Sequence, residues 1–357
     1  MKLVRFASIL ALLLGLLAPV ATVSAASTIY VRPGQSIQAA INRAPSGSLI
    51  SVERGTYFGN LEIKRSVRLI GHDAVIRPAA KPTPNICLTP GSFTGVVGIC
   101  VHGTVDFSTG SVAKALSNVS IEGFIVRNFG GPGILAIGVA GFRAARVVTA
   151  HNGMGMFIDG ASNVSLLDNR AYGNTGDGLF VEDSSANAVI TGNTSYDNLG
   201  SGILFLNSLG GMIASNTVYG NCAGIAVASV ATPDLSPSGD VSIQRNQVTT
   251  NNRMCPAVPG QVPAYGGIGI ALIGARNTVV ALNDVRGNLA QAGSGITGGG
   301  IVVVDGAIFG AGVPSGNSVR LNWLSANTPN DIYGDGTGTA NIASGNICTS
   351  TNLTGAC

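Results

Sequence analysis

The chain has few charged residues, few aromatic residues and almost no lysine. Charged residues make up 10% and aromatic residues 5% of the 357 positions, and the only lysines after residue 25 are Lys64, Lys81 and Lys114. That part of the chain holds 18 basic and 17 acidic residues, so its net charge is close to zero. Nucleic-acid binding requires clustered Lys and Arg to neutralise phosphates, and no such cluster occurs. The sequence therefore predicts no nucleic-acid partner.

Beyond its first 25 residues the chain also lacks an apolar run long enough to span a membrane. The first 25 residues combine Lys2 and Arg5, the apolar run FASILALLLGLLAPV and the small-residue site Val23-Ser24-Ala25. This order is typical of a cleaved secretory signal peptide. We expect residues 1–25 to be a signal peptide, and the mature protein to be secreted or otherwise extracytoplasmic, in the periplasm or at the cell surface.

No Cys-x-x-Cys pair is present, which argues against a redox or zinc motif. Six cysteines in an exported chain instead indicate disulfides. Six cysteines allow 15 pairings, and we expect the pairs that are closest in sequence. These are Cys87–Cys100, Cys222–Cys255 and Cys348–Cys357.

Glycine and asparagine, by contrast, recur in a regular pattern. The chain has 51 glycines, and 45% of its residues are hydrophobic. Pairs of asparagines five residues apart occur six times, at Asn169/Asn174, Asn193/Asn198, Asn216/Asn221, Asn246/Asn251, Asn283/Asn288 and Asn322/Asn327. Two earlier turns keep only the second asparagine, at Asn128 and Asn152, with Gly123 and Val147 where the first would stand. Successive second asparagines from Asn128 to Asn221 are 22 to 24 residues apart.

This repeat predicts stacked coils of short strands. Each asparagine turn is followed by glycine and then by alternating apolar residues, as in Gly178-Leu179-Phe180-Val181. A single coil cannot bury its apolar face, but coils stacked about 4.8 Å apart form a continuous core. Asparagine tolerates the left-handed backbone angles of a tight bend, and stacked asparagines can bond to one another along the stack. We therefore expect an all-β, right-handed parallel β-helix.

The sequence resembles the right-handed parallel β-helix, pectin-lyase-like superfamily. The stretch STIYVRPGQSIQAAINRAPSGSLISVERGTYFGNLEIKRSVRLIGHDAVI is similar to the opening of many members. The resemblance implies that Ser36 to Arg43 form a short helix that caps the open end of the coils, where strand edges would otherwise be exposed. The Asn-Thr-Asp and Arg-Ile-Lys triplets expected of polygalacturonase-like members are absent.

We expect residues 26–357 to form one β-helix domain. Its parts are an N-terminal cap at about 26–80, regular coils at about 116–228, loop-elaborated coils at about 229–336 and a C-terminal cap at about 337–357. Insertions fall at roughly 229–240, 252–266, 289–298 and 305–315. Loops added to neighbouring coils could together form the wall of a groove, or could be neutral surface elaboration.

A group of carboxylates is the main candidate for chemistry. Alignment of the coils places Asp159 and Glu182 in one column on adjacent rungs, with Asp177 and Asp183 beside Glu182. Because Met156, Ile158, Leu179 and Val181 are expected to point inward, Asp159 and Glu182 should point outward. Two carboxylates one rung apart suit a general acid and base, including retaining glycoside hydrolysis, or ligation of Ca²⁺. The alternative is a hydrophilic patch on a solvated face.

His151 is the second candidate, in the turn beside the asparagines. It would join the carboxylates only if its loop folds toward them, and a lone turn histidine is more often plain surface. In the segment HNGMGM it precedes Met154 and Met156, and such soft ligands suit copper. The chain also resembles copper-associated periplasmic β-helix proteins of nitrous-oxide metabolism. Met156 is expected in the core, which leaves at most two ligands.

The resemblance and the carboxylates together favour a carbohydrate-active protein, a hydrolase, lyase or epimerase of a polysaccharide. Its expected catalytic residues are Asp159, Asp177, Glu182, Asp183 and His151. The alternatives are a non-catalytic binding or structural protein of the cell surface, and a periplasmic copper-handling protein. Leu135, Phe157, Phe180 and Leu204 form an outward apolar stripe in this register. Either a loop or a partner chain covers the stripe, or the inward and outward assignment is wrong at that strand.

Overall fold

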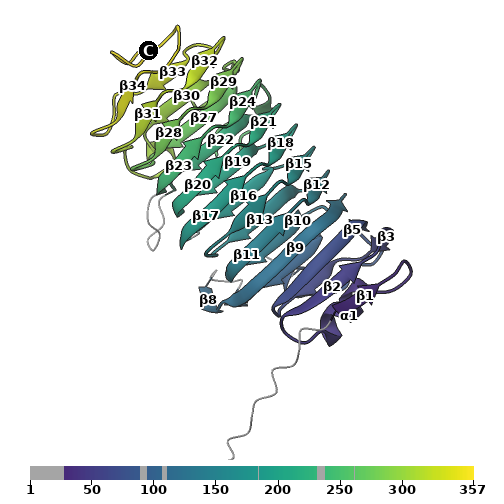
Figure 1. Ribbon diagram of the computed structural model, residues 1–357. Helices are drawn as coiled ribbons and strands as arrows, with labels where there is room; N and C mark the ends of the chain where they lie inside the picture. Colours follow the sequence, from purple (N-terminus) through teal and green to yellow (C-terminus); the bar gives the residue numbers. More distant parts are fainter. Residues whose placement is uncertain (1–27, 89–94, 107–110, 184, 231–237, 261) are drawn as a thin grey trace, which may run out of the picture.

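The computed structural model describes residues 28–357 except 89–94, 107–110, 184, 231–237 and 261. The expected signal peptide lies outside the described residues, as does most of the insertion at 229–240. The chain forms a right-handed parallel β-helix, in which each coil adds a strand to each of three long parallel ladders (Figure 1). Among the described residues, no helix has the length and apolar character needed to cross a membrane.

One of the three ladders is a separate ten-stranded sheet, here called the central sheet, and it carries the candidate site. Its strands, in spatial order, are β4 (Leu61–Ile63), β6 (Ile99–His102), β10 (Pro132–Ile137), β13 (Met154–Asp159), β16 (Leu179–Glu182), β19 (Ser201–Leu206), β22 (Ala223–Ala228), β27 (Ile268–Ile273), β30 (Gly299–Val304) and β33 (Ile332–Gly334).

The other two ladders are joined near the N-terminus by the long strands β5 (Val67–Arg77) and β9 (Leu116–Arg127), which pair with strands of both. One ladder continues with β1 (Thr28–Val31), β2 (Ser48–Val52), β11 (Val139–Ala145), β14 (Ser165–Leu167), β17 (Ser185–Thr191), β20 (Leu209–Ala214), β23 (Gly239–Gln244), β28 (Val279–Ala281), β31 (Ser318–Arg320) and β34 (Ile342–Ser344). The other continues with β3 (Thr56–Phe58), β12 (Val148–Ala150), β15 (Arg170–Tyr172), β18 (Thr194–Tyr196), β21 (Thr217–Tyr219), β24 (Gln247–Thr249), β29 (Asp284–Arg286) and β32 (Trp323–Ser325).

Several short elements lie outside the three ladders. Helix α1 (Ile37–Arg43) begins after Ser36, whose side chain accepts a hydrogen bond from the Ala39 N–H, and it buries Ile37 and Ile41 against the first coils. This confirms the expected capping helix. The remaining elements are η1 (Ile86–Leu88), the hairpin β7 (Thr104–Asp106) and β8 (Ser111–Lys114), the hairpin β25 (Met254–Cys255) and β26 (Tyr265–Gly266), and η2 (Ala307–Phe309).

The asparagines form two buried ladders along the stack. In each, the Oδ1 atom of one asparagine accepts hydrogen bonds from the backbone N–H, and in most rungs also from the amide, of the preceding one. The first runs through Asn169, Asn193, Asn216, Asn246, Asn283, Asn322 and Asn346. The second runs through Asn152, Asn174, Asn198, Asn221, Asn251, Asn288 and Asn327.

The expected register is wrong at the earliest turn. Phe129, and not Asn128, stands above Asn152, since its N–H donates to Asn152 Oδ1 at 3.0 Å. Phe124, and not Gly123, is level with Val147. Asn128 instead occupies the adjacent left-handed position, with φ of 68°. Both phenylalanines are buried, so the first rungs replace the amide ladders with aromatic packing.

All three expected disulfides are present: Cys87–Cys100, Cys222–Cys255 and Cys348–Cys357. The second anchors the β25–β26 hairpin to the start of β22. The insertion at 252–266 is thereby held against the central sheet.

Candidate active site

Asp159 and Glu182 lie side by side on the outer face of the central sheet. They are paired positions at the ends of β13 and β16. Met156, Ile158, Leu179 and Val181 alternate with them and are buried in the core. The expected outward orientation of both carboxylates is therefore confirmed, and the strands that carry them lie about 4.8 Å apart along the stack.

The surroundings of this pair raise the pKa of each carboxyl. Burial raises the pKa of Glu182 to about 8, and the nearby Asp159, Asp183 and Asp177 carboxylates add to the effect. Burial and Asp183 raise the pKa of Asp159 to about 6, against a hydrogen bond from the Gly160 N–H. At pH 7, then, Glu182 holds a proton while Asp159 is largely ionised. A protonated carboxyl beside an ionised one is the arrangement required of an acid and its base.

Asp183 follows Glu182 in the turn, in a left-handed conformation with φ of 49°. Burial raises its pKa to about 6. Its Oδ1 atom is buried and, within the described part of the chain, has no hydrogen-bond partner. A buried carboxylate oxygen without a donor favours the protonated form, which is consistent with the raised pKa.

Asp177 lies at the other end of β16. The Ser201 N–H donates to its Oδ1 at 2.6 Å, yet burial raises its pKa to about 6. The Ser201 side chain is within hydrogen-bonding reach of both Asp177 and the phenol of Tyr265. Burial, followed by the charge of Asp177, raises the pKa of Tyr265. The loop held by Cys222–Cys255 thus brings a tyrosine beside Asp177, at the opposite end of β16 from Glu182.

An apolar surface lies between Asp177 and Glu182. Phe157 and Phe180 stack with ring centroids 4.5 Å apart and planes 14° from parallel. They form an outer cluster, separate from the core, with Leu135 and the partly buried Leu204. Cys87 and Val97 pack on the same cluster. The expected outward stripe is confirmed, and a loop of this chain covers at least its N-terminal part.

His151 lies apart from the carboxylate pair. It occupies the turn before β13, whereas Asp159 ends that strand, and five residues of extended chain separate Met154 from Asp159 by about 16 Å. Its ring makes an edge contact with Tyr172, at 5.5 Å between centroids, on the neighbouring ladder. The structure therefore does not bring His151 into the cluster, because its loop does not fold toward that face.

Met156 is buried in the core, as expected, and cannot join His151 and Met154 around copper. Across the described ranges, no three His, Cys, Asp or Glu side chains are grouped so as to hold a metal ion.

Two residues near the site were missed by sequence reasoning. His102 is level with Ile137 in the column that continues to Asp159, and its Nε2 lies 3.2 Å from Glu62 Oε1. His102 ends strand β6, which lies before the regular asparagine coils, so the repeat does not give its register. Tyr265 comes from an insertion, and no motif in the sequence predicts the path of that loop.

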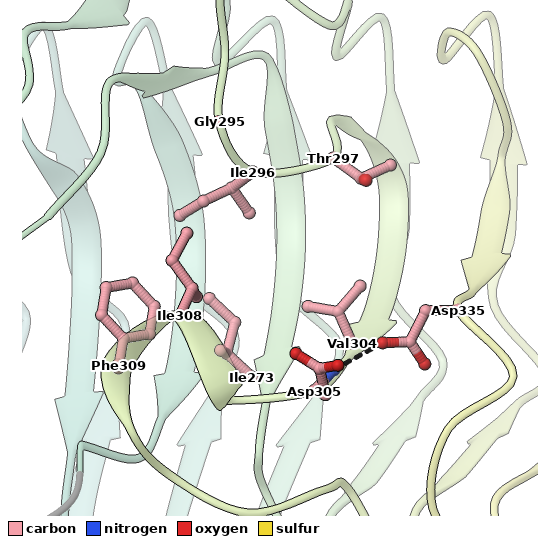
Figure 2. Close-up of a pocket in the computed structure, with 9 residues that line it drawn as sticks. All are labelled: Ile273, Gly295, Ile296, Thr297, Val304, Asp305, Ile308, Phe309 and Asp335. Carbon is pink, nitrogen blue, oxygen red and sulfur yellow. Dashed lines mark hydrogen bonds between the residues drawn. The ribbon is translucent and has the colours of Figure 1, made fainter.

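A cavity opens further along the same face (Figure 2). Its volume is about 200 Å³. Its lining comes from the ends of β27 and β30, from the insertions at 289–298 and 305–315, and from the turn after β33: Ile273, Gly295, Ile296, Thr297, Val304, Asp305, Ile308, Phe309 and Asp335. Two of the expected insertions therefore do combine into one shaped region.

Comparison with known proteins supports the fold. Residues 95–236 match the family model of the right-handed β-helix region. No curated protein sequence matches the chain. The A-module of the mannuronan C-5 epimerase AlgE4 from Azotobacter vinelandii is 19% identical, with a TM-score of 0.56 over 89% of this chain and 93% of that chain.

Two further solved structures have the same architecture. DFA-IIIase from Arthrobacter chlorophenolicus A6, without its lid and in complex with GF2, is 12% identical, with a TM-score of 0.58 over 92% of this chain and 99% of that chain. The Dettilon tailspike protein is 16% identical, with a TM-score of 0.54 over 89% of this chain and 66% of that chain. At these identities the likeness establishes the right-handed parallel β-helix.

Proposed function

We propose that this right-handed parallel β-helix is an extracytoplasmic enzyme that cleaves glycosidic bonds of a polysaccharide, with Glu182 as general acid and Asp159 as nucleophile or base. The observation that carries the proposal is the pair of adjacent outward carboxyls whose pKa values are about 8 and about 6. Asp183 raises the pKa of both through its charge, and Asp177 contributes to that of Glu182. Three disulfides support a location outside the cytoplasm.

Cleavage by hydrolysis fits this site better than elimination or epimerisation of a uronate. Proton abstraction beside a uronate carboxylate requires a positive charge to neutralise that carboxylate. Throughout the described residues, no Lys or Arg forms an ion pair with Asp159, Asp177, Glu182 or Asp183. The names of the mannuronan epimerase and DFA-IIIase support a carbohydrate substrate and leave the reaction type open.

A screen of polysaccharides tests this function. The mature protein is incubated with neutral and acidic polymers, with Ca²⁺ and then with chelator, while reducing ends and the absorbance of unsaturated uronates are followed. We expect new reducing ends without unsaturated products. Unsaturated products would show elimination. A silent panel, with unchanged NMR spectra of the polymers, would favour a binding or structural protein.

The rate of cleavage should have a bell-shaped dependence on pH. Asp159 must be ionised, so the rate rises as pH increases through about 6. Glu182 must be protonated, so the rate falls as pH increases through about 8. Initial rates between pH 4 and 10 on a cleaved polymer measure both limbs. A rate that keeps rising above pH 9 would contradict the assignment of Glu182 as the acid.

The products should retain the anomeric configuration of the substrate. Retaining enzymes hold their carboxyls about 5–5.5 Å apart, and inverting enzymes about 6.5–9.5 Å apart. The strands of Asp159 and Glu182 lie about 4.8 Å apart, so side chains that extend side by side from them would have the first arrangement. Proton NMR of fresh product distinguishes the two, and initial inversion would show that Asp159 acts on a water molecule instead.

A further inference from the structure

We propose that the cavity beside η2 is a second binding site, which takes a non-anionic sugar unit of the same polymer at a distance from the point of cleavage. The inference rests on the proposed function in that it places both sites on one substrate chain. It names the substrate class as neutral or amino-sugar polysaccharide, and excludes polyuronate.

The cavity has one apolar side and one polar side. Ile296, Ile308 and Phe309 gather with Ile273 on one side, and Asp305 and Asp335 lie on the other (Figure 2). A sugar ring has the matching character, since its C–H face is apolar and its hydroxyl edge is polar. Pockets for drug-sized ligands have volumes of about 300–1,000 Å³. A cavity of about 200 Å³ suits a smaller group, such as a single ring.

The polar side is fixed in place by the backbone. Asp335 Oδ2 accepts from the Asp305 N–H at 2.6 Å, and its Oδ1 accepts from the N–H and hydroxyl of Thr337 at 2.8 and 2.6 Å. Asp305 Oδ1 accepts from the Ala307 N–H at 3.1 Å. These bonds hold both carboxylates at the cavity, where they present further acceptor positions to hydroxyl or ammonium groups.

The charge of the lining decides the class of ligand. The two acidic side chains are accompanied by no Lys, Arg or His among the nine lining residues. A uronate or phosphate group would therefore meet like charge without a compensating cation. A neutral sugar would meet only hydrogen-bond acceptors in the two carboxylates. The ammonium group of an amino sugar would also form an ion pair with them.

The position of the cavity relates it to the carboxylate pair. Glu182 is level with Leu206, which is followed in the same column by Ala228, Ile273 and Val304. Ile273 and Val304 line the cavity. Four rungs of about 4.8 Å place Val304 about 19 Å from Glu182 along the stack. A ligand that reaches both must be an extended chain parallel to the axis of the β-helix.

Kinetics with Phe309→Ala test this site. On long oligosaccharides of the cleaved polymer, we expect KM to rise about tenfold with kcat within twofold, because an aromatic contact is lost away from the reacting bond. On the shortest cleaved oligosaccharide KM should not change. Val313→Ala, an exposed position of the same loop outside the cavity lining, is the control. An unchanged KM on long chains, or an equal rise on short ones, would overturn the inference and leave the proposed function standing.

Binding can be measured even if no polymer is cleaved. The protein is labelled at isoleucine methyl groups and titrated with hexasaccharides of glucose, xylose, fructose, glucosamine and galacturonate. We expect the Ile308 methyl signal to shift with at least one neutral or amino sugar, not with galacturonate, and not in the Phe309→Ala variant. A shift with glucosamine alone would identify an amino sugar. A shift with galacturonate, or with none of the five, would overturn the inference.

Discussion

Replacing Glu182 with glutamine is expected to slow cleavage strongly and, at the same time, to stabilise the fold at pH 8 and above. Glutamine cannot donate a proton to the leaving oxygen, so kcat should fall by about 10²- to 10⁴-fold. The same substitution removes a charge from a buried acidic cluster. Loss of activity together with a gain in stability is the signature of a residue kept for chemistry at the expense of the fold.

The sign of the stability change follows from the pKa of Glu182. Its folded value of about 8 lies above its ordinary value of 4.5, so the folded protein binds this proton more tightly than the unfolded chain. The contribution of this group to wild-type stability is therefore greatest below pH 4.5, and this contribution is lost as pH rises through 8. Each pKa unit corresponds to about 1.4 kcal/mol, so the glutamine variant should gain a few kcal/mol at pH 8 and little at pH 5.

Denaturant unfolding at pH 5 and pH 8, alongside initial rates, measures both effects. Glu53→Gln is the matched control, since Glu53 lies half-exposed near the N-terminus and pairs with Arg32 at 3.5 Å. We expect it to change neither rate nor stability appreciably. Near wild-type rates in Glu182→Gln would remove Glu182 from the reaction, and equal stability at pH 8 would show that the cluster does not raise its pKa.

Replacing Asn198 with alanine should destabilise the protein by about 4 kcal/mol. Asn198 is fully buried, and its Oδ1 accepts from both nitrogens of Asn174, at 3.1 Å from the backbone N and 2.8 Å from Nδ2. Its own amide donates to Ala171 O, Ser195 Oγ and Asn221 Oδ1. Alanine removes these five buried hydrogen bonds and leaves the Asn174 N–H without its acceptor. Each lost bond costs about 0.5–1.5 kcal/mol and an unsatisfied buried group about 1–3 kcal/mol.

Denaturant unfolding at constant pH tests this expectation. Asn42→Ala is the control, because Asn42 is exposed in helix α1 and accepts a single side-chain hydrogen bond from Gln38. Its unfolding free energy should change by less than about 0.5 kcal/mol. A similarly small change in Asn198→Ala would mean that the ladder specifies the turn without stabilising it.

The fold could be predicted because its main determinants are local and repeated. Each asparagine of the two ladders accepts hydrogen bonds from the turn of the preceding coil, so asparagine recurs at the same spacing. In the strands between these turns, residues that point inward alternate with residues that point outward. The prediction was wrong by one position at Asn128 because asparagine suits two adjacent positions, the ladder and the left-handed turn residue next to it. Phe129 fills the ladder position there, and a single phenylalanine carries no repeat signal.

The site could be predicted only where it belongs to the repeat. Asp159 and Glu182 are strand residues, so register and parity place them. The position of His151 relative to the carboxylates depends on the direction of its turn, and the spacing of the repeat does not fix that direction. Tyr265 and Phe309 come from insertions, whose paths are set by the Cys222–Cys255 disulfide and by packing on the sheet. The sequence indicates that such loops gather on neighbouring coils, and only the structure shows what they enclose.

We propose that one face of the β-helix holds an acid and a base whose pKa values their surroundings have separated. Carbon-13 NMR of the side-chain carboxyls of Glu182 and Asp159, titrated from pH 3 to 10, measures this directly. We predict that the Glu182 carboxyl titrates near pH 8 and the Asp159 carboxyl near pH 6. Titration of both near pH 4 would show two ordinary surface carboxylates and would contradict the account.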